Sequence, residues 1–237
     1  MSLLPRPPVA LAYHGVGRAG DAEDPSRLVV SPAHLEAQIS LLQRRGYRFR
    51  TAAELLEESG GGPPARATAV LTFDDGFADA LELTAPLLRR LGVRATFYVC
   101  PGWWGGQHEL VAGPAGRLLD RDDARRLQDE AGMELGSHTI SHPDLRGLDD
   151  HALYRELSDS RAAVEDLTGR PCRTLAYPFG LFDERVERAA RTVGYELAWG
   201  WLPGRWQPFA APRLPAPPRH GARRLALKLL GIRRPGR

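Results

Sequence analysis

The chain has 237 residues, 43% of them hydrophobic and 26% charged, which allows a sizeable core within one large domain. Its 32 basic and 29 acidic residues give a net charge of +3, too balanced to indicate a nucleic-acid partner. The only two cysteines, Cys100 and Cys172, form no CxxC pattern, which argues against a disulfide framework or a cysteine-type zinc site. We expect both to be buried as small apolar side chains.

Short apolar runs alternate with helical patterns from the start of the chain. The run VALAY at 9–13 predicts a strand, and Ser31-Pro32 predicts the start of a helix, with serine as N-cap and proline in the first turn. TAAE at 51–54 is a capping box, which is typical of a second helix start. The β-branched run AVLTF at 69–73 predicts a buried strand.

The same alternation continues through the second half of the chain. We expect further strands at 95–100, 133–137, 174–178 and 195–199. We expect a helix with Leu81, Leu88 and Leu91 on one side, and further helices at 120–131, 149–168 and 183–193. Residues 202–219 are rich in proline, and we expect the regular structure to end before them. Strand–helix alternation predicts an α/β fold of parallel strands with crossover helices.

Polar segments directly follow three of the predicted strands. Asp74 and Asp75 follow the strand 69–73, GSHTISHPDL with His138 and His142 follows another, and LAYPFG runs out of a third. In α/β barrels the active site forms at the carboxyl ends of the strands. We therefore expect the three segments to meet at one end of a barrel.

Two histidines four residues apart can reach one metal ion from a helix or a tight turn. With one carboxylate, His138 and His142 would form a two-histidine, one-aspartate set that leaves room for water. Of Asp74 and Asp75, one would then bind the ion and the other would act as a base. Taken separately, either aspartate could instead be a helix N-cap, and the two histidines could be structural residues.

The segments TFDDG, SHTISHP and AYPFG resemble, in this order, the motifs of the polysaccharide deacetylases, the NodB-homology group. The resemblance runs from about Val9 to Leu214, and YHGVG and PRLP are similar to the branch with the poly-N-acetylglucosamine deacetylases. It implies a distorted (β/α) barrel, here with about seven strands. It also implies metal-dependent removal of an N-acetyl or O-acetyl group from an amino-sugar-containing glycan or glycoconjugate.

Carried over position by position, Asp75, His138 and His142 match the ligands of one divalent metal ion, for which we expect zinc. Asp74 matches the catalytic base. The backbone N–H near Phe179 matches a donor to the oxyanion.

The third motif departs from the family pattern, and Tyr177 within it is a candidate for substrate binding. Many members have arginine where this chain has Ala176 and tyrosine where it has Phe179. Arg213 could supply the missing positive charge, or it could be a solvated loop residue. The usual late histidine is absent too, so we expect His14 to be the general acid; the alternative is a hydrogen-bonded structural histidine.

Trp103 and Trp104 lie in a glycine-rich loop, where they could stack on sugar rings or pack in the core. Two other functions stay open: a metal-dependent hydrolase of another C–N bond, such as a cyclic amide or imide, and a sugar-binding homologue with weak catalysis.

We expect residues 1–219 to form the barrel domain and residues 220–237 a basic tail or helix. In ARRLALKLLGIRR, Leu225, Leu229 and Leu230 lie near one helical face among arginines and a lysine, as in helices that lie on anionic membranes. The alternative is a helix packed on the barrel with its charges solvated. We see no signal peptide and no long apolar run, so we expect a cytoplasmic protein, peripheral at the inner membrane face if the tail binds lipid.

Overall fold

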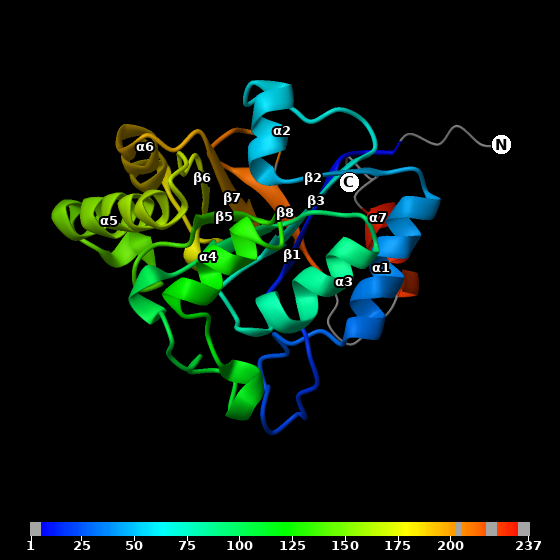
Figure 1. The fold of residues 1–237 in the computed structure, drawn as a ribbon. Helices are drawn as coiled ribbons and strands as arrows, with labels where there is room; N and C mark the ends of the chain where they lie inside the picture. The colour runs from blue at the N-terminus through cyan, green and yellow to red at the C-terminus, as the bar shows by residue number, and fades with distance from the viewer. Residues whose placement is uncertain (1–5, 202–204, 217–221, 232–237) are drawn as a thin grey trace.

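The computed structural model describes residues 6–201, 205–216 and 222–231. Within them, seven parallel strands close into a barrel that helices surround (Figure 1), which confirms the predicted distorted (β/α) barrel. Around the barrel the strands are β1 (Val9–Tyr13), β3 (Thr68–Phe73), β4 (Thr96–Val99), β5 (Glu134–Ser137), β6 (Thr174–Ala176), β7 (Leu197–Trp201) and β8 (Ala211–Pro215), which pairs with β1 again. A further short strand, β2 (Arg48–Arg50), pairs with the start of β3.

The helices begin where the sequence carries capping residues. The Ser31 side chain accepts the N–H of His34, and Thr51 and Glu54 form the predicted capping box. The described helices are α1 (Pro32–Arg44), α2 (Ala52–Ser59), α3 (Ala85–Arg90), α4 (Arg121–Asp129), α5 (Asp150–Thr168), α6 (Glu184–Val193) and α7 (Ala222–Gly231).

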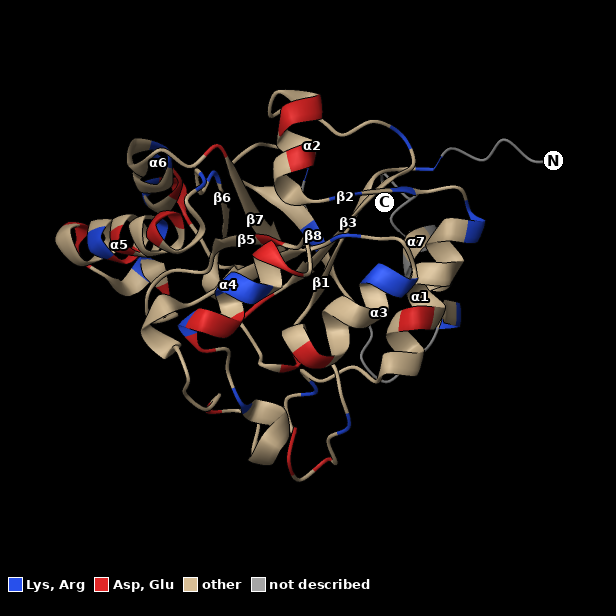
Figure 2. Ribbon diagram, in the orientation of Figure 1, with Lys and Arg blue, Asp and Glu red and all other residues tan. Residues whose placement is uncertain are grey.

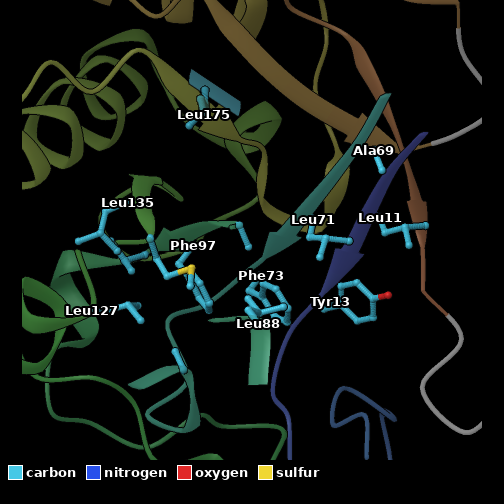
Figure 3. Packing of buried hydrophobic residues seen from close by; sticks show 14 of the residues in the cluster. Leu11, Tyr13, Ala69, Leu71, Phe73, Leu88, Phe97, Leu127, Leu135 and Leu175 are labelled. Carbon is cyan, nitrogen blue, oxygen red and sulfur yellow. The ribbon is translucent and has the colours of Figure 1, made fainter. Parts of the chain in front are cut away.

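Alternate residues of each strand serve two different layers of the core. In β3, Leu71 and Phe73 point outward to the helices, whereas Val70 belongs to the smaller cluster inside the barrel. Figure 3 shows the outer cluster, where Phe73 stacks between Tyr13 and Phe97 of the neighbouring strands, at ring-centroid distances of 5.1 and 4.8 Å. Both cysteines are buried and free, as the sequence predicts.

Three features differ from the sequence prediction. The proline-rich segment contains β8, although proline removes a backbone donor from a strand. The prediction was wrong because β8 lies between β7 and β1, where closing the barrel outweighs local propensity. The short β2 was missed, and the helix expected after Asp75 starts as a π-helical turn (Ala80–Thr84) before α3.

The basic tail forms the predicted helix, α7. Its apolar side chains Leu225 and Leu229 are buried in the main core cluster, and α7 lies against α1 (Figure 1). The side chains of Lys228 and Leu230, like residues 232–237, lie outside the described part. The described apolar face is thus occupied by packing, as in the alternative of a helix packed on the barrel, and the described residues do not support a membrane contact.

Charges of both signs cover the outer helices. Figure 2 shows acidic and basic residues together along α4, α5 and α6, in keeping with the balanced net charge. None of the described helices is long and apolar enough to cross a bilayer.

Candidate active site

The polar segments identified in the sequence meet at the carboxyl ends of the strands. Asp74 and Asp75 follow β3, His138 follows β5, and His14 follows β1. The loops after β1 and β4 extend from the same end, at the lower edge of Figure 1, while α2 lies at the opposite end. The predicted convergence of three segments on one end of a barrel is confirmed by two distances. Oδ1 of Asp75 lies 3.4 Å from Nε2 of His138, and the ring centroid of Phe179, in the third segment, lies 4.6 Å from that of His142.

Asp75 lies at the centre of this group. Its backbone has a φ of 72°, and with Gly76 at 78° it forms a left-handed turn that points the carboxylate into the barrel end. Its Oδ1 lies 3.4 Å from Nε2 of His138 and 3.5 Å from Nε2 of His142. This oxygen is buried, and it has no hydrogen-bond partner among the described residues.

In its neutral form, His138 presents an unprotonated nitrogen to that oxygen. Its Nδ1 lies 2.7 Å from the carbonyl oxygen of Ala176, which can only accept, so the ring donates from Nδ1 and keeps a lone pair on Nε2. Burial opposes a charge on this ring, but the two aspartates raise its pKa. The site therefore favours positive charge at this point.

His142 completes the set from a tight turn rather than a helix. Its φ is 58°, and its N–H donates to Oγ1 of Thr139, whose φ of 67° is also left-handed. Burial and the neighbouring His138 lower the pKa of His142 to about 4, which leaves it neutral near pH 7.

Three potential ligand atoms thus face one another. One ligand atom each of Asp75, His138 and His142 lies within 4.8 Å of the other two. An orphaned carboxylate oxygen opposite two imidazole nitrogens is stabilised by a cation between them. The residues present therefore fit a divalent metal ion.

Asp74, the second aspartate of the pair, is held by an arginine. Nη1 of Arg213 donates to its Oδ1 over 2.7 Å and to Oγ1 of Thr72 over 3.0 Å. Burial of Asp74 would raise its pKa, but the charges of Arg213 and His138 outweigh this and lower it. The other oxygen, Oδ2, lies 4.0 Å from Nε2 of His138 and so faces the centre of the site.

Arg213 reaches Asp74 because alternate residues of β8 point into the barrel. It is fully buried, and its guanidinium lies over the rings of Trp201 and Tyr98, at 5.1 and 5.8 Å from their centroids. The structure thus brings a positive charge from β8 to Asp74, the expected base. The third motif has Ala176 in place of the arginine that is usual in the family.

His14 and Phe179 lie on either side of the central group. Nε2 of His14 is 4.0 Å from Oδ2 of Asp75, and the side chain is 24% exposed. Phe179 has a φ of 56° in the turn after β6, and its N–H donates to no other described residue. Both groups are therefore free to meet a substrate.

The remaining candidates are divided between the site and the core. Trp103 borders the site, with its ring centroid 5.2 Å from that of His142. Trp104 packs against the main core cluster. Tyr177 is fully buried, and its hydroxyl donates to the carbonyl oxygen of Phe209, so its side chain is not placed to contact a substrate.

Two residues at the site were missed in the sequence. His108, in the loop after β4, lies 3.2 Å from Asp75, measured from Nε2 to Oδ2. Glu156 of α5 accepts the N–H groups of Ile140 and Ser141, over 2.9 and 3.0 Å, and so holds the turn between the two ligand histidines. Neither belongs to a motif: one is a single histidine among glycines, and the other resembles any glutamate on a helix.

Comparison with known proteins agrees with this geometry. Residues 61–198 match the family model described as polysaccharide deacetylase. The chain is 25% identical over 195 residues to the putative polysaccharide deacetylase YxkH of Bacillus subtilis, an alignment that covers 82% of this chain and 64% of that protein. It is 21% identical over 213 residues to a poly-β-1,6-N-acetyl-D-glucosamine N-deacetylase of Staphylococcus aureus, covering 80% of this chain and 71% of that one.

Among solved structures, the fold is similar to that of the Streptococcus pyogenes deacetylase PplD in complex with acetate. The TM-score is 0.79 at 22% identity, and the alignment covers 95% of this chain and 99% of that one. With a family model that spans both the aspartate pair and the two histidines, the chain belongs to the polysaccharide deacetylase family.

Proposed function

We propose that this protein is a metal-dependent hydrolase that removes an acetyl group from an amino-sugar unit of a glycan or glycoconjugate. Asp75, His138 and His142 would hold one divalent ion, with zinc as the expected metal. The observation that carries the proposal is the orphaned Oδ1 of Asp75, which faces two imidazole nitrogens beside a second aspartate. A fold that buries such a set without a cation would leave its charge uncompensated.

The two aspartates have separate roles in this proposal. A bound divalent ion would polarise the acetyl carbonyl as a Lewis acid and make an attacking water more acidic. Asp74, kept ionised by Arg213, would accept the proton of that water through Oδ2, the oxygen that faces the site. Because Arg213 occupies Oδ1, only one oxygen of this base is open to water.

Two further groups would act on the acetyl group as it reacts. The free N–H of Phe179 would donate to the developing oxyanion, a contribution of about 3 kcal/mol for such donors. His14 would give a proton to the departing amine, because an amine leaves poorly without one. A positioned acid of this kind contributes roughly 10²- to 10⁴-fold.

The aromatic residues around His142 support a sugar as the substrate. The ring centroid of Phe179 lies 4.6 Å from that of His142, and Trp103 lies on the same imidazole at 5.2 Å. Phe179 is 48% exposed, so its ring is open to a sugar face. The named activity of the Staphylococcus aureus relative makes N-acetylglucosamine oligomers the first substrates to try.

Acetate release from N-acetylglucosamine oligomers tests the proposal. The protein is freed of metal with a chelator, assayed, and assayed again after one equivalent of zinc, with Asp74→Asn as the inactive control. We expect acetate only after zinc is restored and only from the unaltered chain. Acetate release that persists without metal contradicts metal dependence; ring-opened product from a cyclic imide, with no acetate, points to the other hydrolase class.

A further inference from the structure

His108 is buried in the loop between β4 and α4, 33 positions from the aspartate that it meets. Its side chain is 4% exposed, and its Nε2 lies 3.2 Å from Oδ2 of Asp75. A buried histidine next to a candidate metal ligand is either a further ligand or a group that holds the ligand in place.

The tautomer of His108 follows from its second nitrogen. The backbone N–H of Leu110 donates to Nδ1 over 3.1 Å, so Nδ1 carries the lone pair and the proton of the neutral ring is on Nε2. The ring therefore donates to Oδ2 of Asp75. His138 does the opposite, since its proton is on Nδ1 and its lone pair faces Oδ1.

One carboxylate thus meets a donor at Oδ2 and, from the neutral ring of His138, an acceptor at Oδ1. Among the described residues, the group able to hold an ion comprises Asp75, His138 and His142, without His108. The hydrogen bond from His108 occupies Oδ2, so the orphaned Oδ1 is the oxygen left for a cation.

The surrounding loop fixes the His108 ring. It stacks on Phe77, at 4.9 Å between centroids and 20° between planes, and meets the edge of Trp103 at 5.6 Å. The backbone N–H of His108 donates to the carbonyl oxygen of Gly116 over 2.7 Å. The loop can therefore hold the donor at one place and orientation relative to Asp75.

We propose that His108 is a positioning residue that orients the Asp75 carboxylate, so that Oδ1 alone is presented to the metal ion. This inference rests on the proposed metal site, which it extends to an outer group. Outer groups that orient a ligand typically change metal affinity by roughly 10- to 100-fold. His108 would act on zinc affinity without touching the ion.

A matched pair of variants separates the hydrogen bond from the ring. His108→Phe keeps an aromatic ring against Phe77 but has no donor, whereas His108→Gln keeps an N–H near the position of Nε2. We expect zinc affinity, from competition with a chromophoric chelator, to fall by roughly 10- to 100-fold in His108→Phe and to stay within a few-fold of the unaltered protein in His108→Gln. Equal zinc affinity in His108→Phe and the unaltered chain overturns the inference.

Two readouts show whether His108 positions or ligates. In the metal-free protein, ¹⁵N shifts of the imidazole should report a proton on Nε2; a proton on Nδ1 overturns the inference. With cobalt in place of zinc, the visible absorption of His108→Gln should match that of the unaltered protein, because no ligand is lost. A changed cobalt spectrum would make His108 a ligand and overturn the positioning role.

Failure of the underlying proposal gives a different result. An unaltered chain that takes up no zinc would contradict the metal site itself and the role of His108 with it. A chain that binds zinc with unchanged affinity in His108→Phe would leave the metal site standing and remove only His108.

Discussion

Two carboxylates at opposite ends of the barrel can be compared, Glu134 at the amino ends of the strands and Asp75 at their carboxyl ends. Oε2 of Glu134 accepts the N–H of Ala53 over 2.9 Å and the hydroxyl of Thr96 over 3.0 Å. Its Oε1 accepts the hydroxyl of Thr174 over 3.2 Å. Both oxygens of Glu134 are thus hydrogen-bonded by neutral donors, whereas Asp75 has one oxygen without a partner.

The two carboxyl groups also differ in the direction of their pKa values. Burial raises the pKa of Glu134 in spite of its donors. Burial would raise that of Asp75 too, but the neighbouring His108, His138 and His14 outweigh it and hold the pKa well below its usual range. Glu134 therefore joins α2 to three strands as a closed hydrogen-bond network, and Asp75 is open to a further positive charge.

Backbone strain is also concentrated at the carboxyl ends of the strands, although Ala67, just before β3, has a positive φ too. Asp75, Thr139, His142 and Phe179 all have positive φ and all lie at the carboxyl ends of the strands. Non-glycine residues adopt this region only at a cost of about 1–3 kcal/mol each, which the surrounding structure must offset. Strain and incomplete hydrogen bonding together mark this end as the one shaped for chemistry.

The largest effect is expected from Asp74→Asn, which tests whether the carboxyl-end aspartates have divided roles. The amide cannot accept the proton of water, so deacetylation should fall by roughly 10³- to 10⁴-fold, the upper part of the typical range for general acid–base catalysis, because no second base is proposed. Zinc content should be unchanged, since a base and not a ligand is lost. Near-normal acetate release from Asp74→Asn would assign the base to another residue.

His14→Ala should reduce the deacetylation rate by roughly 10²- to 10⁴-fold with zinc still bound. The reduction in rate should be smaller with an activated acetyl ester as the substrate, because its leaving group needs no proton. His151→Ala, on the exposed surface of α5, serves as the matched control and should leave both rates unchanged. The same loss on both substrate types would show that His14 has a structural role instead.

Glu134→Ala should break the amino-end network without touching the metal. Removing the acceptor leaves the N–H of Ala53 and two threonine hydroxyls unpaired, so the free energy of unfolding should fall by about 1–3 kcal/mol. Glu134→Gln, which keeps an acceptor oxygen, should lose less. Denaturant titration measures both; a loss of zinc affinity in Glu134→Ala would mean that the two ends are not independent.

A further carboxyl group, Asp79, gives the smallest effect and a pH dependence. It has neutral donors like Glu134, including the hydroxyl of Thr84 at 2.6 Å, and burial raises its pKa to about 7. The folded state therefore binds this proton more tightly than the unfolded state, so stability should decrease as pH rises from about 4 to 7. Asp79→Asn should remove roughly 1–3 kcal/mol of that decrease, measured by denaturant titration at each pH; identical pH profiles would contradict it.

Local signals in the sequence are enough to predict most of the barrel. Capping residues mark the starts of α1 and α2, and apolar runs mark β1 and β3 within one residue. The strand β8 could not be predicted, because its prolines argue against a strand and only barrel closure requires one there.

The residues of the candidate site likewise differ in whether the sequence predicts them. The aspartate pair, His138 and His142 are predicted from their spacing and their place after strands, since parallel strands bring their carboxyl ends together. The choice of Asp75 rather than Asp74 as the ligand comes from the resemblance to the family motifs. His108 is not predicted in this way, because its contact with Asp75 depends on the path of a glycine-rich loop that no periodicity describes. A residue that forms a hydrogen bond to a predicted site residue is thus harder to predict from the sequence than the site residue itself.

The central claim is that the unpartnered oxygen of Asp75 is part of a metal site, and zinc titration of the metal-free protein by calorimetry tests it directly. In Asp75→Asn, the N–H of His108 should attract the amide oxygen and turn the NH₂ group toward His138 and His142. We predict one zinc ion per chain for the unaltered protein, and an affinity weaker by roughly 10²-fold or more for Asp75→Asn. Equal affinity and stoichiometry in the two proteins would contradict the account.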